Sequence, residues 1–288
     1  QIIARAKRQG IKLSPKQLFE KQTVGQLAAV AKLIEAKPAV ASAQPARGPL
    51  PLLPIQARFF ETEIARRQHW NQSVMLQPTT TLDANHLRTA LTALVEQHDA
   101  LALNFQASGD TWQVLPQTQR DPELLWVREL DSLAALPALA DEAQRSLDLQ
   151  QGRLLRAVLV NLPDAEQRLL LVIHHLVVDG VSWRILLEDL QHAYTALATG
   201  TAMVLPGKST SLHSWAEHLQ RYAQCEALVA ESEYWRTTLE AGDAQLPQDF
   251  PQERQARGQA ARASSRLSQA LTHKLLKVAP AAYRTQIN

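Results

Sequence analysis

The sequence predicts an α/β fold in which helices cover a mixed or antiparallel sheet. The first observation is the order of the expected elements, which runs strand, helix, strands, helix, strands, helix from residue 70 to residue 200. The second is the segment 169–173, whose five consecutive apolar residues predict a strand buried on both faces. The third is the composition, since 45% hydrophobic and 20% charged residues in a chain of 288 suit one large globular domain or two smaller ones.

Charge, hydropathy and cysteine content narrow the classes of function. A net charge of +2 does not indicate a nucleic-acid partner. No apolar run approaches the length of a membrane span, and residues 1–10 lack the apolar core of a signal peptide. Cys225 is the single cysteine, which excludes an intrachain disulfide and fits a reducing, cytoplasmic compartment. We interpret it as a packing or surface residue and not as a nucleophile.

Residues 1–35 are predicted to form a short helical unit. Gly10 ends a first helix, and Ser14 is expected to cap a second that extends to residue 19. Thr23 is expected to cap a third helix, which carries on one face Leu27, Val30, Ala31 and Ile34. A unit this small buries too little surface to fold alone, so we interpret it as the end of a domain that begins upstream.

Residues 36–48 are rich in alanine and proline and show no apolar period, which is a linker composition. We therefore predict a first unit at 1–35, a linker at 36–48 and a second domain at 49–288. Both ends of the chain suggest a fragment, because residues 1–10 read as a helix already under way and residues 283–288 carry no closing signal.

Periodicity and turn residues locate the elements of the second domain. Strands are predicted at residues 70–76, 101–105, 112–115, 124–127, 154–162 and 169–173. Helices are predicted at residues 83–98, 131–149, 183–200, 213–223 and 227–239, and from 267 to about 280. Asp83 and Ser182 are the expected caps of the first and third of these helices, and Gly200 ends the third. We interpret His98 as a helix-end histidine and the arginine-rich segment 241–262 as a solvated loop.

Polar residues with catalytic potential lie in the segment 174–184, between the buried strand and the third helix. Adjacent side chains of a strand point to opposite faces, so His174 and His175 cannot both enter one pocket. A neutral histidine is a plausible base near pH 7. Asp179 is expected to be a buried anchor that bonds loop amides or pairs with an arginine, either Arg284 or the local Arg184. Gly180 would permit a tight or positive-φ turn. The alternative is a strand end whose histidines are only structural. A metal site is not expected, because the two histidines diverge.

The seventeen residues HHLVVDGVSWRILLEDL at 174–190 resemble the HHxxxDG motif of nonribosomal peptide synthetase condensation-type domains, and more closely its epimerization branch. PIQ at 54–56, WNQSVML at 70–76 and AAYRTQIN at 281–288 also resemble epimerization domains. The sequence departs from the family pattern at Arg58, where the family has tryptophan, and at Ala102, where it has arginine. GIKLSPKQLFEKQTVGQLA at 10–28 resembles the last helices of a peptidyl carrier domain.

The resemblance implies a fold of two chloramphenicol-acetyltransferase-like lobes, of which the first is complete here and the second only begun. It implies that His175 is catalytic and that Asp179 is mainly structural, with His174, Gly180 and Ser182 supporting the motif. Such a domain removes the Cα proton of an aminoacyl or peptidyl thioester and returns a proton to the opposite face. The family's glutamate for that face would lie beyond residue 288.

The resemblance also implies the partners. The substrate would arrive on the 4′-phosphopantetheine arm of the upstream carrier domain, whose modified serine would lie before residue 1, and this chain would bind no cofactor itself. An adenylation domain would precede the carrier, and a condensation domain or module would follow. Two alternatives stay open: a condensation domain, which shares the HHxxxDG motif, and a non-catalytic docking remnant.

Overall fold

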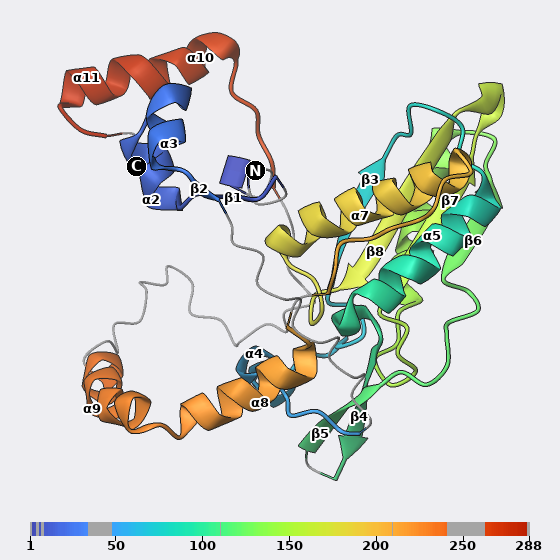
Figure 1. Ribbon diagram of the computed structural model, residues 1–288. Helices are drawn as coiled ribbons and strands as arrows, with labels where there is room; N and C mark the ends of the chain where they lie inside the picture. The colour runs from blue at the N-terminus through green and yellow to red at the C-terminus, as the bar shows by residue number, and fades with distance from the viewer. Residues whose placement is uncertain are drawn as a thin grey trace. The chain divides into compact units, whose positions relative to one another are not determined.

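Figure 1 shows the computed structural model of the chain, which describes residues 2–3, 6, 9–33, 48–109, 111–208, 210–240 and 263–286. The linker predicted at 36–48, apart from its last residue, and the loop predicted at 241–262 lie outside the described residues. The chain forms two compact units, one of residues 1–62 and 68–243 and the other of residues 63–67 and 244–288. The segment 174–184 belongs to the larger unit.

A four-stranded mixed sheet lies at the centre of the larger unit (Figure 1). Its strands are β3 (Asn71–Leu76), β6 (Leu125–Glu129), β7 (Leu155–Asn161) and β8 (Gln167–His174). They are ordered β3-β8-β7-β6, with β6 and β7 parallel and the other neighbours antiparallel. The sequence predicted a mixed or antiparallel sheet, and the sheet is mixed. Strand β8 is central, and its residues 169–174 are all buried.

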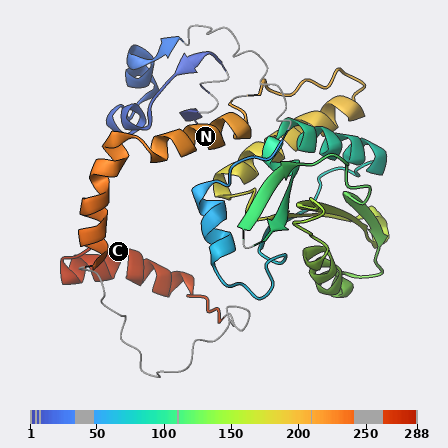
Figure 2. The ribbon, with the colours of Figure 1, turned by 90° about the horizontal axis from the view of Figure 1, so that it is seen from below.

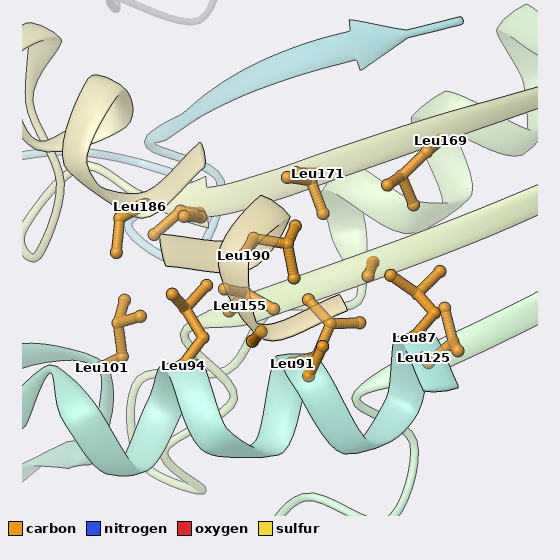
Figure 3. Packing of buried hydrophobic residues seen from close by; sticks show 14 of the residues in the cluster. Leu87, Leu91, Leu94, Leu101, Leu125, Leu155, Leu169, Leu171, Leu186 and Leu190 are labelled. Atoms are coloured by element: carbon orange, nitrogen blue, oxygen red, sulfur yellow. The ribbon is translucent and has the colours of Figure 1, made fainter. Parts of the chain in front are cut away.

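Two helices cover one face of the sheet. Helices α5 (Ala84–Gln97) and α7 (Gly180–Ala198) form one hydrophobic cluster with β7 and β8. Figure 3 shows Leu91 and Leu94 of α5 directed toward Leu155 of the sheet and Leu190 of α7. The alternate residues 169, 171 and 173 of β8 supply this face, as the two-residue period of a strand requires.

Helix α6 (Leu136–Arg145) covers the opposite face. Leu139 and Ala143 of this helix form a second cluster with Leu170 and Val172, the residues of β8 that point the other way. Figure 2 shows α6, drawn in green, on the far side of the sheet from α5 and α7. The unit is therefore a three-layer α/β/α arrangement, and the continuous apolar run of β8 follows from burial on both faces.

A hairpin and a short helix form a third cluster next to the end of β8. The hairpin consists of β4 (Leu103–Ser108) and β5 (Thr111–Pro116), and the helix is α4 (Pro54–Glu61). Phe105 is completely buried in this cluster, and Phe60 of α4 stacks on Trp112 of β5 with ring centroids 4.3 Å apart. Phe59 of α4 reaches the end of β8, which links this cluster to the segment 174–184.

The helix predicted at 131–149 is shorter than expected. A 3₁₀ turn (Leu133–Ala135) precedes α6, which ends at Arg145. The chain then turns because the Asp148 side chain accepts hydrogen bonds from the backbone N–H groups of Gln150 and Gln151. A local side-chain hydrogen bond of this kind competes with helix continuation. Gly152 completes the turn with a φ of +70°.

Two helices follow α7 in the larger unit, close to their predicted positions. They are α8 (Leu212–Ala223) and α9 (Glu226–Glu240). The smaller unit contains α10 (Gln269–His273), a π-helical turn (Lys274–Val278) and α11 (Ala279–Tyr283). The prediction that this helix ends near Pro280 is wrong. Pro280 lies in the first turn of α11, directly after the π-helical turn, and the helical segment continues to Tyr283.

The N-terminal segment contains β1 (Ile11–Lys12), α2 (Pro15–Glu20), α3 (Val24–Val30) and β2 (Lys32–Leu33). Ser14 and Thr23 cap α2 and α3 through their side-chain oxygens, as predicted. The third helix is shorter than predicted, because Ala31 is extended and β2 pairs with β1. The division into 1–35, 36–48 and 49–288 stays a prediction. Among the described residues, no helix is both long and apolar enough to cross a membrane.

Candidate active site

His174 is held inside the protein. It is the last residue of β8, and its side chain is completely buried. Its backbone N–H donates to the Leu154 carbonyl at 2.9 Å, and its Nδ1 accepts from the Leu176 backbone N–H at 3.2 Å. The ring packs edge-on against Phe59, with centroids 5.7 Å apart. These contacts fix the end of the strand and leave His174 without access to solvent.

His175 is the next residue and its side chain is exposed. Its backbone N–H still bonds the sheet, donating to the Trp70 carbonyl at 2.8 Å. Its ring Nδ1 lies 2.8 Å from the Val178 carbonyl oxygen. A carbonyl oxygen only accepts, so Nδ1 carries the hydrogen of this bond. The divergence of the two histidines predicted from strand geometry is what the structure shows.

The turn that carries His175 is short, because α7 begins at Gly180. Asp179 is the N-cap of α7, and its Oδ1 accepts from the backbone N–H groups of Val181 at 3.0 Å and Ser182 at 2.7 Å. The Ser182 hydroxyl donates to the same oxygen at 2.6 Å. The prediction that Ser182 caps this helix is wrong. Ser182 instead lies in the first turn and donates its hydroxyl to the Asp179 cap. Asp179 is the better cap because its charged carboxylate accepts from the free N–H groups two and three residues further on.

The Asp179 carboxylate is exposed, so the expectation of a buried group paired with arginine needs correction. Within the described part of the larger unit no ion pair joins Asp179 to Arg184. Arg284, the other predicted partner, belongs to the smaller unit, and that pairing stays a prediction. The hydrogen bond from the Ser182 hydroxyl, followed by that from its backbone N–H, holds the pKa of Asp179 below its usual value. Asp179 is therefore charged at neutral pH and fixes the start of α7.

Gly180 plays a smaller part than expected. It is the first residue of α7 and has no positive φ, and a Cβ added there would meet no atom within 4 Å. The prediction of a special turn at this glycine is therefore wrong. The tight geometry comes from the Asp179 cap and not from glycine flexibility.

Two residues that the motif does not contain complete the surroundings of His175. Gln72 of β3 places its Nε2 3.3 Å from the His175 Nε2. Trp183 of α7 donates its indole Nε1–H to the Gln72 Oε1 at 2.8 Å. Gln72 was not predicted as a site residue, because 103 positions separate it from His175 and only the pairing of β3 with β8 brings them together. The one sequence feature that pointed to Gln72 is WNQSVML, which resembled epimerization domains but did not indicate a role for this residue.

The arrangement suits general-base chemistry. An exposed imidazole whose Nδ1–H is held by a backbone carbonyl leaves Nε2 as the nitrogen that can take a proton.

A cavity of about 260 Å³ lies elsewhere in the unit, and its lining includes Glu96, Arg120 and Arg153 but no residue of 174–184. Among the described residues, no group of three or more histidine, cysteine, aspartate or glutamate side chains could hold a metal ion.

Comparison with known proteins identifies the family. A family model described as the condensation domain matches residues 46–288. The chain belongs to the condensation domain family. The resemblance to condensation-type domains of nonribosomal peptide synthetases is thereby confirmed.

Relatives of known name are large synthetases. A linear gramicidin synthase protein from Brevibacillus parabrevis is 45% identical over the whole chain, which spans 6% of that protein. A surfactin synthase protein from Bacillus subtilis (strain 168) is 40% identical over 86% of the chain, which corresponds to 7% of that protein. The chain therefore matches only a small part of each of these proteins.

Solved structures confirm the fold. The epimerization domain from the third module of tyrocidine synthetase B matches with a TM-score of 0.70 and 36% identity, over 84% of this chain and 55% of that one. The X-domain from teicoplanin biosynthesis matches with a TM-score of 0.69 and 23% identity, over 84% of this chain and 54% of that one, and supports the fold alone. This condensation-domain chain has the mixed α/β, chloramphenicol-acetyltransferase-like fold that the resemblance implied.

Proposed function

We propose that this chain epimerizes an aminoacyl or peptidyl thioester at Cα, as part of a nonribosomal peptide synthetase. The observation that carries the proposal is the exposed His175 at the end of a buried strand, with its Nδ1–H directed to the Val178 carbonyl. The comparisons favour epimerization, because the matched epimerization domain shares 36% identity while a starter condensation domain shares 19%.

The proposed reaction moves one proton off the substrate and one onto it. The thioester carbonyl acidifies the Cα–H, and the His175 Nε2 takes that proton as the C–H bond breaks. The electron pair moves into the carbonyl and forms an enolate. A proton delivered to the opposite face of Cα, while the electron pair returns, gives the inverted centre. The family resemblance implies a glutamate from the second half of such a domain at that face.

The proposal includes the delivery of the substrate. The thioester would be carried on the 4′-phosphopantetheine arm of a peptidyl carrier domain upstream, loaded by an adenylation domain of the same synthetase. A downstream condensation domain would take the D form. No cofactor of this chain's own enters the proposed reaction, because the thioester itself supplies the electron sink.

Deuterium incorporation tests the proposal. The synthetase module that contains this chain is loaded with an L-aminoacyl thioester in deuterated buffer, without any acceptor. Epimerization predicts deuterium at Cα and a mixture of D and L products after hydrolysis of the thioester. Unlabelled, fully L product would contradict the proposal.

Condensation is the second candidate, because the matching family model is the condensation domain and both activities use the HHxxxDG motif. Here the histidine would serve amide formation between two carrier-bound substrates. Amide formation after addition of a downstream aminoacyl carrier, with no label at Cα, would assign the chain to condensation. Neither label nor amide would leave the docking remnant as the correct alternative.

A further inference from the structure

A network of hydrogen bonds crosses the candidate site and involves both ring nitrogens of His175, the catalytic candidate. It begins at the indole Nε1–H of Trp183, which donates to the Gln72 Oε1 at 2.8 Å. It continues from the Gln72 Nε2 to the His175 Nε2, 3.3 Å apart. It ends with the His175 Nδ1 and the Val178 carbonyl oxygen, 2.8 Å apart. The network therefore joins four residues from three segments of the polypeptide, and two of them, Gln72 and Val178, contact the imidazole of His175.

The groups at the two ends of this hydrogen-bond network each have only one possible role, as donor or as acceptor. An indole N–H can only donate, so the side of the Gln72 amide that faces Trp183 must be its oxygen. The amide NH₂ then faces His175, and NH₂ can also only donate. At the other end, the Val178 carbonyl can only accept. The orientation of the amide and the tautomer of the imidazole are thus determined by neighbours that cannot exchange roles.

We propose that Gln72, oriented by Trp183, is a positioning residue that holds His175 in the neutral tautomer with Nδ1 protonated and Nε2 free to accept a proton. The proposal rests on the proposed function for its catalytic meaning, but not for the tautomer itself. At 3.3 Å the Gln72 contact is long enough to yield when a substrate Cα–H approaches Nε2. The contact therefore prepares the base without blocking it.

The same network opposes the wrong states of His175. A tautomer with hydrogen on Nε2 would point it at the Gln72 NH₂ and would leave the Val178 carbonyl without its donor. Rotating the Gln72 amide by half a turn would relieve the first conflict but would set its NH₂ against the Trp183 N–H. Each alternative thus leaves two donors facing each other, which costs the hydrogen bond and adds repulsion.

The fold keeps these partners in place. Asn71 of β3 pairs with His174, the last residue of β8, and Gln72 pairs with Ile173. Gln72 therefore lies beside the end of β8, close to His175. Trp183 lies in the first turn of α7, which Asp179 caps, and its ring packs against the main hydrophobic cluster. The Asp179 cap therefore also sets the position of the Trp183 N–H that orients Gln72.

Nitrogen NMR on the 288-residue chain with ¹⁵N-labelled histidine measures the tautomer directly. The His175 signals are identified by their loss in His175→Gln. The expected wild-type result is a protonated, pyrrole-type signal for Nδ1 and an unprotonated, pyridine-type signal for Nε2 at neutral pH. A wild-type spectrum with hydrogen on Nε2 would overturn the proposal without any further variant.

Gln72→Glu tests the role of the amide. A carboxylate offers only acceptors, so one oxygen keeps the Trp183 bond and the other attracts a hydrogen onto the His175 Nε2. The expected result is loss of the pyridine-type Nε2 signal at neutral pH. Gln106→Glu, which places the same change on an exposed glutamine of β4, is the matched control and leaves the His175 signals unchanged. An unchanged His175 spectrum in Gln72→Glu would refute the role of Gln72.

Trp183→Phe tests the role of the indole N–H. Phenylalanine keeps an aromatic ring but lets the Gln72 amide rotate, so we expect a second set of His175 signals with hydrogen on Nε2. Trp235→Phe removes an exposed indole that donates to Glu231 in α9 and serves as the control. A single, wild-type tautomer in Trp183→Phe would show that the indole does not orient Gln72.

Activity separates positioning from mere packing. If the network acts on protonation, α-proton exchange falls by about 10²-fold or more in Gln72→Glu, since a general base contributes about 10²–10⁴-fold. Gln72→Met offers the His175 Nε2 neither a donor nor an acceptor, so exchange should fall less than in Gln72→Glu, which places an acceptor there. A purely steric role predicts the reverse order, because glutamate matches glutamine more closely in shape. If wild type shows the tautomer with Nδ1 protonated but does not exchange the substrate α-proton, the proposed function is rejected and the proposed role of Gln72 still holds.

Discussion

His174 and His175 are neighbours in sequence with opposite surroundings, so the same substitution has different consequences. His175→Ala is expected to abolish exchange of the substrate α-proton with solvent. It should lower the free energy of unfolding by about 0.5–1.5 kcal/mol, because the side chain is exposed and the main loss is its hydrogen bond to the Val178 carbonyl. His174→Ala is expected to lower that free energy by about 1–3 kcal/mol, because a buried, hydrogen-bonded ring is lost. Exchange assays and urea unfolding measure the two effects. A fully stable His174→Ala protein without exchange would mean that the roles are reversed.

Asp179 acts as a helix cap, which changes the size of the effect expected from its replacement. Asp179→Ala is expected to lower the free energy of unfolding by about 1 kcal/mol, the typical value of an N-cap. Asp179→Asn should retain most of that stability, because asparagine caps about as well as aspartate. Asp131→Ala, at an exposed aspartate ahead of α6, is the control for urea unfolding. A loss in Asp179→Asn as large as in Asp179→Ala would point to a partner of the charge outside the cap.

The depressed pKa of Asp179 predicts a pH dependence with a definite sign. Because hydrogen bonds from Ser182 lower the folded-state pKa, the contribution of the carboxylate to stability is present above its unfolded pKa of about 3.8. It is lost as the pH falls through the still lower folded-state pKa. Wild type should therefore lose more stability than Asp179→Asn when urea unfolding is compared between about pH 5 and pH 2. Parallel curves for the two proteins would contradict this assignment.

At the scale of elements, the turn between α6 and β7 depends on one glycine. Gly152 has a φ of +70°, and a Cβ there would lie 2.9 Å from the Leu103 carbonyl oxygen of β4. Gly152→Ala is therefore expected to combine backbone strain of about 1–2 kcal/mol with a clash against the hairpin. Gly109→Ala is the matched control, since Gly109 has a φ of +59° and open space around its Cα. Chemical denaturation should show the larger loss for Gly152→Ala, and equal losses would show that the hairpin shifts freely.

At the scale of the whole molecule, the sheet separates two hydrophobic layers. Leu91 is completely buried between α5 and one face of the sheet, and Leu139 is buried between α6 and the other. Leu91→Ala is expected to cost about 2–5 kcal/mol, and Leu139→Ala less, because Leu139 is 8% exposed. The two losses should add within about 0.5 kcal/mol in the double variant, since the residues share no cluster. Strong non-additivity in urea unfolding would show that the layers couple through the sheet.

The buried strand at 169–173, the α/β class, the cap at Asp83 and the family could all be predicted from the amino-acid pattern, because each depends on local periodicity, local hydrogen bonding or a continuous motif. It also predicted that the two histidines diverge, since a strand alternates its side chains. The surroundings of His175 could not be predicted in this way, because they depend on long-range packing. Gln72 reaches it through the register of β3 on β8, across 103 positions, and no local pattern specifies that register. The ion pair of the buried Arg156 with Asp121 at 3.2 Å was not predicted for the same reason. Contacts between distant segments depend on how the segments pack and not on the spacing of residues along the sequence.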